Sequence, residues 1–163
     1  MSEKDSGARN WALSAPRMAY RALATGIAVI IMEILAALVA LPLPLVPFVT
    51  SIVLTVSAPD TPAAHPYPVI AGHMLSTLAG FIVLWSLGPG ELQNGLAVAL
   101  AVLAMLLLKA LHPPAALDAF VVTSHGVGSE WAIMPVLIGA VMLAVYGRAT
   151  YWIERKLFGA QAV

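Results

Sequence analysis

The 163-residue chain contains no cysteine, and Asp, Glu, Lys and Arg together make up only 10% of it. Without cysteine it can form no disulfide, no thiolate nucleophile and no cysteine-ligated zinc site. Eight basic residues balance eight acidic ones, so the basic excess typical of nucleic-acid-binding proteins is missing. Hydrophobic residues make up 61%, against about 45–50% in soluble domains. A chain of this size cannot bury so much apolar surface in its own core. The composition therefore predicts an integral membrane protein in contact with a lipid bilayer.

The basic residues gather at the two ends of the chain, and between Arg21 and Arg148 only Lys109 is basic. Because Lys and Arg are enriched in cytoplasmic segments, we expect both termini in the cytoplasm and an even number of crossings. The first apolar stretch, 22–41, is too long for a typical signal-peptide core and is expected to be an uncleaved helix. The predicted location is the inner (cell) membrane of a bacterium.

A membrane-spanning helix needs about 20 apolar residues, with about 17–25 tolerated. Four segments meet this requirement: Ala22–Leu41, Val69–Gly88, Gly95–Leu111 and Trp131–Trp152. Two shorter apolar pieces, Leu45–Ser57 and Pro113–Ser124, begin at or beside prolines. Proline is tolerated in the first turn of a helix and breaks it further in, so each piece predicts a short half-helix. The expected fold is an all-α membrane protein with about four transmembrane helices and two re-entrant or half helices.

Matches at an offset of 67 residues predict an internal repeat in the chain. The offset aligns identical residues in six pairs: Pro47 with Pro114, Ser57 with Ser124, Pro68 with Pro135, Val69 with Val136, Gly72 with Gly139, and Gly80 with Gly147. We expect one transmembrane domain at 18–157, with halves at about 20–88 and 91–155. A cytoplasmic lead at 1–17 and a tail at 158–163 flank it. Re-entrant pieces would make the halves parallel and spanning pieces would make them inverted, and the short length favours re-entry.

Broken helices in paired repeats are the best sequence pointer to a transport site. The unpaired N–H groups at a helix start, with the helix dipole, attract small anions. In the first half-helix the expected donors are the amides near Thr50 and Ser51 and their hydroxyls. In the second they are the amides after Pro114, with His112 just before it; Pro113 and Pro114 are expected to fix the helix start.

The run His-Pro-Pro-Ala-Ala at 112–116 resembles the signature of the HPP family of small integral membrane proteins. The run Ala-Pro-Asp-Thr-Pro at 58–62, followed by Gly72 and His73, is similar to that family's other well-marked stretch. The resemblance covers roughly residues 20–155. It implies a four-helix membrane protein and a transporter, with nitrite transport in plastid and cyanobacterial members. Asp118 departs from the family pattern, because many relatives have a threonine at this place in the run.

Charged groups inside membrane segments are costly, and a functional role is the default hypothesis. Glu33 lies near the middle of the first span and is a candidate for proton coupling, or a neutral hydrogen-bonded side chain. Asp118 lies in the first turn of the second half-helix, where it could cap the helix or gate the solute. His73, one turn into the second span, could contact solute or another helix.

Small residues at fixed spacing predict close helix packing, which GxxxG-like patterns allow in membranes. The residues concerned are Gly72, Ser76 and Gly80 in the second span, and Gly139 and Gly147 in the fourth. Four spans enclose a pore poorly, so a homo-oligomer is expected.

The chain has no H-E-x-x-H, G-x-S-x-G, P-loop or dinucleotide fingerprint, and we expect neither an enzyme nor a cofactor or metal. The predicted function is a transporter or channel for a small inorganic anion such as nitrite. The site residues would be His112, Pro113, Pro114, Thr50, Ser51, His73 and Asp118. The alternatives are a cation or proton pathway using Glu33 and Asp118, and a membrane scaffold or binding subunit without flux.

Overall fold

A computed structural model describes residues 13–39 and 47–159, and in these residues the chain is all-α, as predicted. The six α-helices are α1 (Ala15–Val39), α2 (Phe48–Ser57), α3 (Pro66–Leu87), α4 (Glu91–Leu107), α5 (Ala116–His125) and α6 (Ile138–Phe158). Short 3₁₀ turns lie at Pro62–Ala64, Pro113–Ala115 and Ser129–Ala132, and a π-helical turn at Ile133–Leu137 leads into α6. Three stretches are long and apolar enough to cross a membrane, namely Ala15–Leu38, Pro66–Leu87 and Ser129–Phe158. The prediction of an all-α membrane protein is confirmed.

The helices differ from the predicted spans mainly at their ends. The first helix begins at Ala15 rather than at Ala22. Its first two turns include Arg17 and Arg21, whose side chains are buried against α6 and hydrogen-bonded to it. The predicted third span, Gly95–Leu111, corresponds to α4, which runs from Glu91 to Leu107 and is not among the three stretches long enough to cross a membrane. Its continuation is interrupted at Lys109, whose backbone is left-handed with φ 53°. The predicted first-span end at Leu41 and the start of the first half-helix at Leu45 lie outside the described residues.

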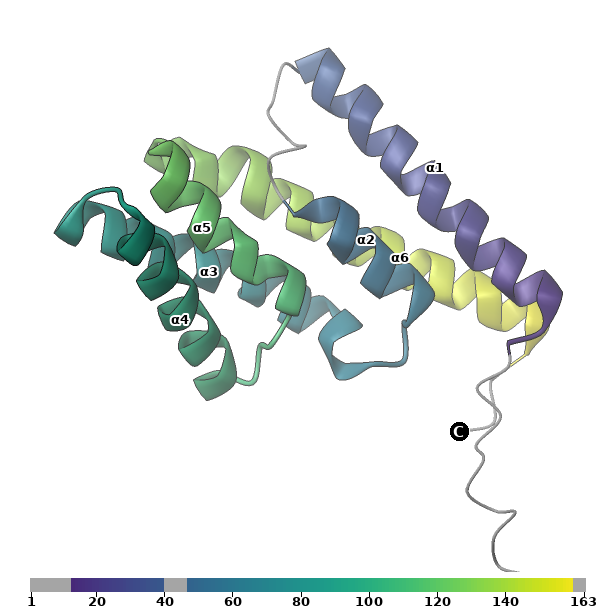
Figure 1. Ribbon diagram of the computed structural model, residues 1–163. Coiled ribbons are helices and arrows are strands. Elements are labelled where there is room, and N and C mark those ends of the chain that lie inside the picture. The colour runs from purple at the N-terminus through teal and green to yellow at the C-terminus, as the bar shows by residue number, and fades with distance from the viewer. Residues whose placement is uncertain (1–12, 40–46, 160–163) are drawn as a thin grey trace, which may run out of the picture.

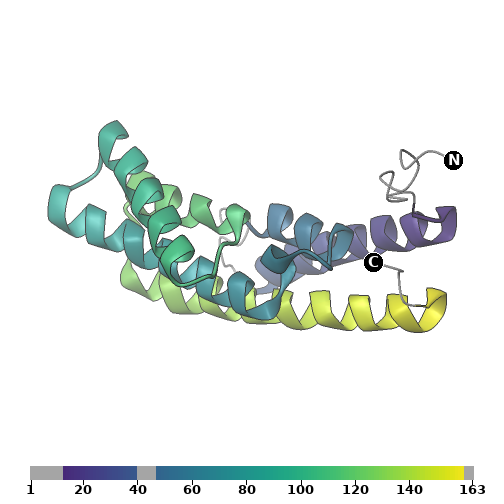
Figure 2. The ribbon, with the colours of Figure 1, turned by 90° about the horizontal axis from the view of Figure 1, so that it is seen from below.

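Helices α1 and α6 lie side by side and antiparallel (Figures 1 and 2). The hydroxyl of Tyr20 donates to the Thr150 carbonyl at 2.8 Å, and that of Tyr146 donates to the Ala24 carbonyl at 2.7 Å. The start of α1 and the end of α6 thus share one end of the molecule, here called the terminal end. The opposite end, where α3 leads into α4, is called the far end.

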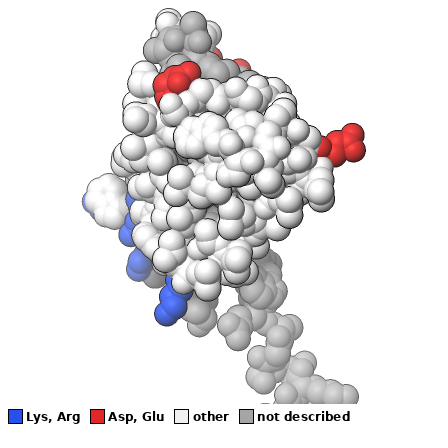
Figure 3. All heavy atoms as spheres, turned by 90° about the vertical axis from the view of Figure 1, so that its left-hand side faces the viewer, with Lys and Arg blue, Asp and Glu red and all other residues white. Residues whose placement is uncertain are grey.

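The exposed surface of α1 carries larger apolar side chains than its buried side. Every fourth residue faces the protein, and these residues are mostly small: Ala24, Ala28, Met32 and Ala36. Larger apolar side chains such as Leu23, Ile30 and Leu38 are exposed. Figure 3 shows the far end of the molecule, where most of the visible atoms belong to uncharged residues. Small residues inside and large apolar residues outside are what helix packing within a lipid bilayer favours.

Helix α3 is the centre of the fold and packs against α4, α5 and α6. Glycines allow these close approaches. A Cβ atom at Gly72 would lie 2.8 Å from the Cβ of His112, and one at Gly80 would lie 2.8 Å from the Cβ of Val122. The hydroxyl of Ser76, between the two glycines, accepts the Ala119 N–H at 3.1 Å. The stripe predicted for helix packing therefore contacts α5 and the residues leading into it, within the same chain.

The contacts between the halves follow the 67-residue offset. Gly80 packs on Val122, and the equivalent Gly147 packs on Thr55, the equivalent of Val122. Gly139 faces the ring of Phe48 near the start of α2. Each short helix therefore runs parallel to the last helix of the other half: α5 along α3, and α2 along α6.

The two short helices point to opposite ends of the molecule. The end of α2 lies toward the terminal end, because Arg21 donates to the Ser57 carbonyl at 2.7 Å and Tyr151 donates to Asp60 at 2.7 Å. Along α3, α5 advances from Gly72 to Gly80 and so ends toward the far end. Of the two arrangements that the sequence leaves open, the structure has the inverted one.

The preference for re-entry, with both following loops on one side, is therefore wrong. The preference rested on helix length alone. A short helix can belong to a segment that crosses the membrane when non-helical residues beside it cover the remaining thickness. Residues 110–112 lie outside any helix before α5, and His112 among them is extended.

Candidate functional site

A chain of hydrogen bonds joins four fully buried side chains in the middle of the fold. Oδ2 of Asp118 lies 2.6 Å from Nδ1 of His73, whose Nε2 lies 3.0 Å from the Ser51 hydroxyl. The same hydroxyl lies 2.8 Å from Nε2 of His112, and Nδ1 of His112 lies 2.7 Å from the Ala63 carbonyl oxygen. All four side chains have an exposed fraction of 0%. We call Asp118, His73, Ser51 and His112 the polar chain.

Each member of the polar chain comes from a different element. His73 lies on α3, Ser51 in the first turn of α2, and Asp118 in the first turn of α5. His112 lies in the extended backbone before the Pro113–Ala115 turn, with φ −126° and ψ 92°. The starts of the two half-helices thus meet on opposite ring nitrogens of one histidine.

Ser51 and Asp118 occupy equivalent places in the repeat, because they are 67 residues apart. The first half supplies a hydroxyl and the second a carboxylate. The polar chain is therefore chemically unequal, although both residues lie in the first turn of a short helix.

The surroundings of His73 are tightly packed and partly aromatic. The rings of His73 and His112 have centroids 5.3 Å apart, and the ring of Phe48 lies 5.2 Å from that of His73. The Thr77 hydroxyl donates to the His73 carbonyl at 2.8 Å. Oδ1 of Asp118 is buried and has no hydrogen-bond partner among the described residues. That oxygen is the one acceptor of the polar chain left open to a further donor.

Four of the residues singled out in the sequence are thus brought together, and the others are not. Thr50 is exposed, and its hydroxyl donates to the Pro47 carbonyl at 2.8 Å, away from the polar chain. Pro113 and Pro114 open the 3₁₀ turn before α5 and do not join the polar chain. Glu33 is exposed on α1, so the structure does not pair it with Asp118.

The expected free amides after Pro114 are not free. The Ala115 N–H donates to the His112 carbonyl at 3.0 Å, and the Ala116 N–H donates to the carbonyls of Pro113 and Pro114. The expectation is wrong because the prolines start a 3₁₀ turn, whose tighter pairing uses these donors. Side chains, rather than backbone N–H groups, therefore carry the polar character of the second half-helix start.

A second buried cluster, which the sequence analysis missed, holds the terminal end together. Arg21 donates to both carboxylate oxygens of Glu154, from Nε at 3.0 Å and from Nη2 at 2.8 Å. Arg17 donates to the carbonyls of Phe158 and Gly159 at 3.0 and 2.8 Å. We call Arg17, Arg21 and Glu154 the terminal ion cluster. Arg17 and Arg21 lie four residues apart, so they share one face of a helix, and this spacing was the available signal.

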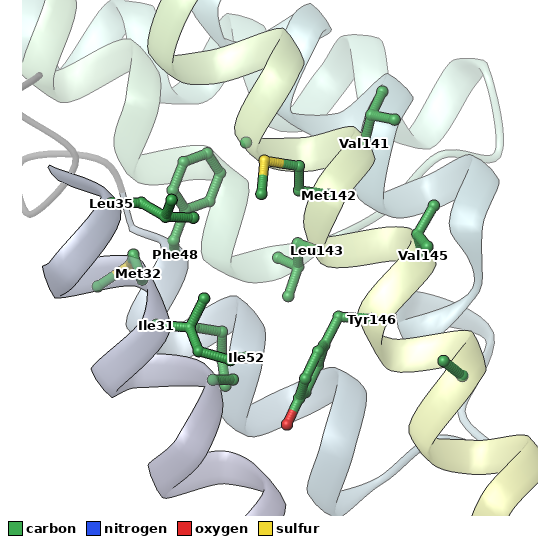
Figure 4. A pocket seen from close by; sticks show the side chains of 13 residues that line it. Ile31, Met32, Leu35, Phe48, Ile52, Val141, Met142, Leu143, Val145 and Tyr146 are labelled. Carbon is green, nitrogen blue, oxygen red and sulfur yellow. The ribbon is translucent and has the colours of Figure 1, made fainter. Parts of the chain in front are cut away.

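A pocket of about 460 Å³ opens between α1, α2 and α6 (Figure 4). Its labelled lining is apolar apart from the Tyr146 hydroxyl, which donates to the Ala24 carbonyl. Phe48 lines this pocket and also contacts the ring of His73. The pocket therefore has the chemistry of a lipid-facing groove, and Phe48 lies between it and the polar chain.

The comparisons with known proteins identify the family. The model of the HPP transmembrane region matches residues 11–157, nearly the whole chain. The chain belongs to the HPP transmembrane family. The HPP tripeptide itself, 112–114, leads into α5 and begins with the histidine of the polar chain.

Two curated relatives are transmembrane proteins of Dictyostelium discoideum. The chain is 30% identical to one over 105 residues, which covers 59% of this chain and 36% of the relative. It is 29% identical to the other over 104 residues, covering 59% and 33%. The chain thus spans about a third of the length of these relatives. No solved structure gives a significant match.

Proposed function

We propose that this HPP-family membrane protein is a transporter rather than an enzyme, and that the polar chain is its solute site. The observation that carries the proposal is the meeting of two half-helix starts, from inverted halves, on the single buried residue His73. Transporters with inverted repeats bind their solutes where discontinuous helices meet near the membrane midplane. Buried polar groups are costly in a bilayer, and they mark solute pathways by default.

The proposed solute is a small inorganic anion such as nitrite. The polar chain offers imidazole N–H groups and one hydroxyl as donors, and these are the groups that hydrogen-bond an oxyanion. Its only acidic member, Asp118, is 2.6 Å from His73, so a proton on the imidazole offsets the carboxylate charge. The family resemblance points to the same solute class.

A cation or proton pathway is the second candidate. It is favoured by the unpaired buried oxygen of Asp118, because a bare carboxylate oxygen attracts a cation or a proton. In the sequence this alternative used both Asp118 and Glu33, but Glu33 is exposed on α1. The alternative therefore rests on Asp118 alone.

The test is nitrite uptake into liposomes that contain the purified full chain. Two neighbouring hydroxyls provide a matched pair of variants. Ser51→Ala removes a member of the polar chain, whereas Thr50→Val removes an exposed hydroxyl bonded to its own helix start. A neutral hydrogen bond is worth about 0.5–1.5 kcal/mol, so Ser51→Ala should lower uptake roughly 2- to 10-fold and Thr50→Val should leave it close to wild-type.

The opposite results separate the alternatives. Uptake no faster than in protein-free liposomes would favour a membrane subunit without flux. Cation flux that is lost in Asp118→Asn, with Ser51→Ala indifferent, would favour the cation or proton pathway.

We also propose that both termini face the cytoplasm of a bacterial cell and that copies of the chain associate. The orientation is supported by exposed basic residues at the terminal end, namely Arg148, Arg155 and Lys156. Association is supported by the long exposed apolar face of α1. Only a narrow stripe of this helix packs against the other described residues. Crosslinking of the purified protein in membranes would test it.

A further inference from the structure

The hydrogen bonds of the polar chain fix how many protons it holds. The Ala63 carbonyl can only accept, so Nδ1 of His112 must carry a proton. When the Ser51 hydrogen stays within the polar chain, one imidazole neighbour donates to the hydroxyl and the other accepts from it. Four bonds therefore require four protons. Two neutral imidazoles, a hydroxyl and an ionised carboxylate supply only three.

The completed polar chain thus stores one extra proton, and its net charge is zero. In one form the extra proton lies in the bond between His73 and Asp118, on Nδ1 of an imidazolium beside a carboxylate or on Oδ2 of a neutral acid, and His112 is neutral. The other form arises when Nε2 of His73 gives its proton to Ser51 while Ser51 gives its own to Nε2 of His112. His73 is then neutral, His112 is the imidazolium, and the carboxylate is unchanged. No bond is lost and no proton leaves the site, so the stored proton can move through Ser51 between the two histidines.

A fifth proton changes what the site can bind. With both histidines doubly protonated, both Nε2–H groups donate to the Ser51 oxygen, and the Ser51 hydrogen becomes free to donate elsewhere. The polar chain then has a net charge of +1 and one unused donor, which is what a monovalent oxyanion requires. Binding the anion returns the net charge to zero.

Net charge decides which solute can enter. The four side chains have no exposed surface, and burying an uncompensated charge is expensive. An anion entering alone would leave the site with a charge of −1, whereas an anion entering with a proton leaves it neutral, as it was when empty. We propose that this protein carries its anion together with a proton, which His73 and His112 share through Ser51. This inference rests on the anion transport proposed above.

The other ionisable groups of the described residues do not take part. Ser51 is the member of the polar chain that lies on α2, and the sequence of α2 from Phe48 to Ser57 contains no ionisable residue. On α4 the only charged residue is Glu91, exposed in the first turn at the far end. On α6 the buried Glu154 is paired with Arg21. Lys109, in the segment before His112, is exposed. The proton inventory is therefore that of His73, His112 and Asp118.

The first test drives transport with a pH gradient. Full-length protein in liposomes is held at zero voltage with a potassium ionophore, with nitrite initially equal on both sides. If one proton moves with each anion, the anion should accumulate about tenfold for each unit of pH difference. One pH unit supplies about 1.4 kcal/mol per proton, and this energy corresponds to a tenfold concentration ratio. Initial rates are compared, because passive nitrous acid reaches the same final accumulation more slowly, and its rate in protein-free liposomes is subtracted.

Ser51→Ala interrupts the connection between the histidines, so the initial rate of pH-driven accumulation should fall toward the protein-free rate. Thr123→Val is the matched control, because Thr123 is also fully buried but its hydroxyl bonds only to carbonyls of its own helix. Uptake driven by voltage, with no response to the pH gradient, would overturn the coupling and leave anion transport standing.

The second test does not need flux. The chain contains four histidines, and of these His65 and His125 are exposed and serve as internal references. In ¹⁵N-histidine NMR spectra of the purified protein near neutral pH, adding nitrite should convert a buried imidazole from the singly to the doubly protonated form. Buried histidine signals that keep their protonation state at saturating nitrite would overturn the coupling. If the signals change but no flux is measured, nitrite binding is coupled to protonation and only the transport proposal is refuted.

Discussion

The carboxylate of Asp118 lies 2.6 Å from the imidazole of His73, and neither side chain has any exposed surface. Each group makes the burial of the other tolerable. Removing one partner of a buried ionic pair typically costs about 3–5 kcal/mol, because the remaining charge is left uncompensated. Loss of either partner should therefore destabilise the fold, and the pair also sets the charge of the proposed site.

Asp118→Asn separates the anion and cation interpretations. The amide oxygen can still accept from Nδ1 of His73, but the negative charge is gone, so the extra proton is no longer held. We expect nitrite uptake to persist within a few-fold of wild-type while accumulation driven by a pH gradient is lost. Uptake and accumulation are measured in the same liposomes. Complete loss of flux would instead favour the cation or proton pathway.

Gly80→Ala should destabilise the fold. The added Cβ would lie 2.8 Å from the Cβ of Val122 and 3.0 Å from the backbone of Ala119, and such overpacking costs about 1–3 kcal/mol. Gly26→Ala is the control, because no heavy atom lies within 4 Å of its added Cβ. That change should be neutral or stabilising by up to about 1 kcal/mol. Unfolding midpoints in detergent report both, and equal midpoints would contradict the assigned packing.

Glu154→Gln should loosen the terminal end. It leaves Arg21, which is only 7% exposed, without its charged partner, and the expected loss is about 3 kcal/mol in the free energy of unfolding. Glu91→Gln makes the same chemical change at an exposed residue and should shift stability by no more than about 0.5 kcal/mol. Adding Arg21→Met to Glu154→Gln should recover part of the loss. A stability unchanged by Glu154→Gln would show that the cluster contributes nothing.

Single cysteines can test the inverted topology, because the natural chain has none. A cysteine at Ala64 should react from the same side of the membrane as one at position 5 or 160. A cysteine at Val127 should react from the opposite side. If the cysteines at 64 and 127 both react from the same side of the membrane, the re-entrant arrangement of the two short helices would be supported instead.

Much of the polar chain could be found from the sequence, since Ser51, His73, His112 and Asp118 all stand out as polar residues near helix breaks. Their mutual contacts could not. The bonds between them span from 22 residues, between Ser51 and His73, to 61, between Ser51 and His112. No local pattern encodes which ring nitrogen meets which partner.

The errors also have physical causes. Helix length does not encode direction, so it favoured the wrong one of the two arrangements that the sequence leaves open. The prolines before α5 were correctly expected to start it, but their 3₁₀ turn pairs the amides that an anion would need. Arg17 and Arg21 were interpreted only as topology signals, because their partner Glu154 lies more than 130 residues away.

The paired contacts of Gly80 with Val122 and of Gly147 with Thr55 have a consequence for the ancestry of the fold. They are the contacts that a single three-helix unit would make with an upside-down copy of itself, each short helix lying against its neighbour's last helix. Such a unit would have had to enter the membrane in both orientations. Fusion of the two copies would have fixed one orientation for each half, and it would have allowed the shared position to hold a serine on one side and an aspartate on the other.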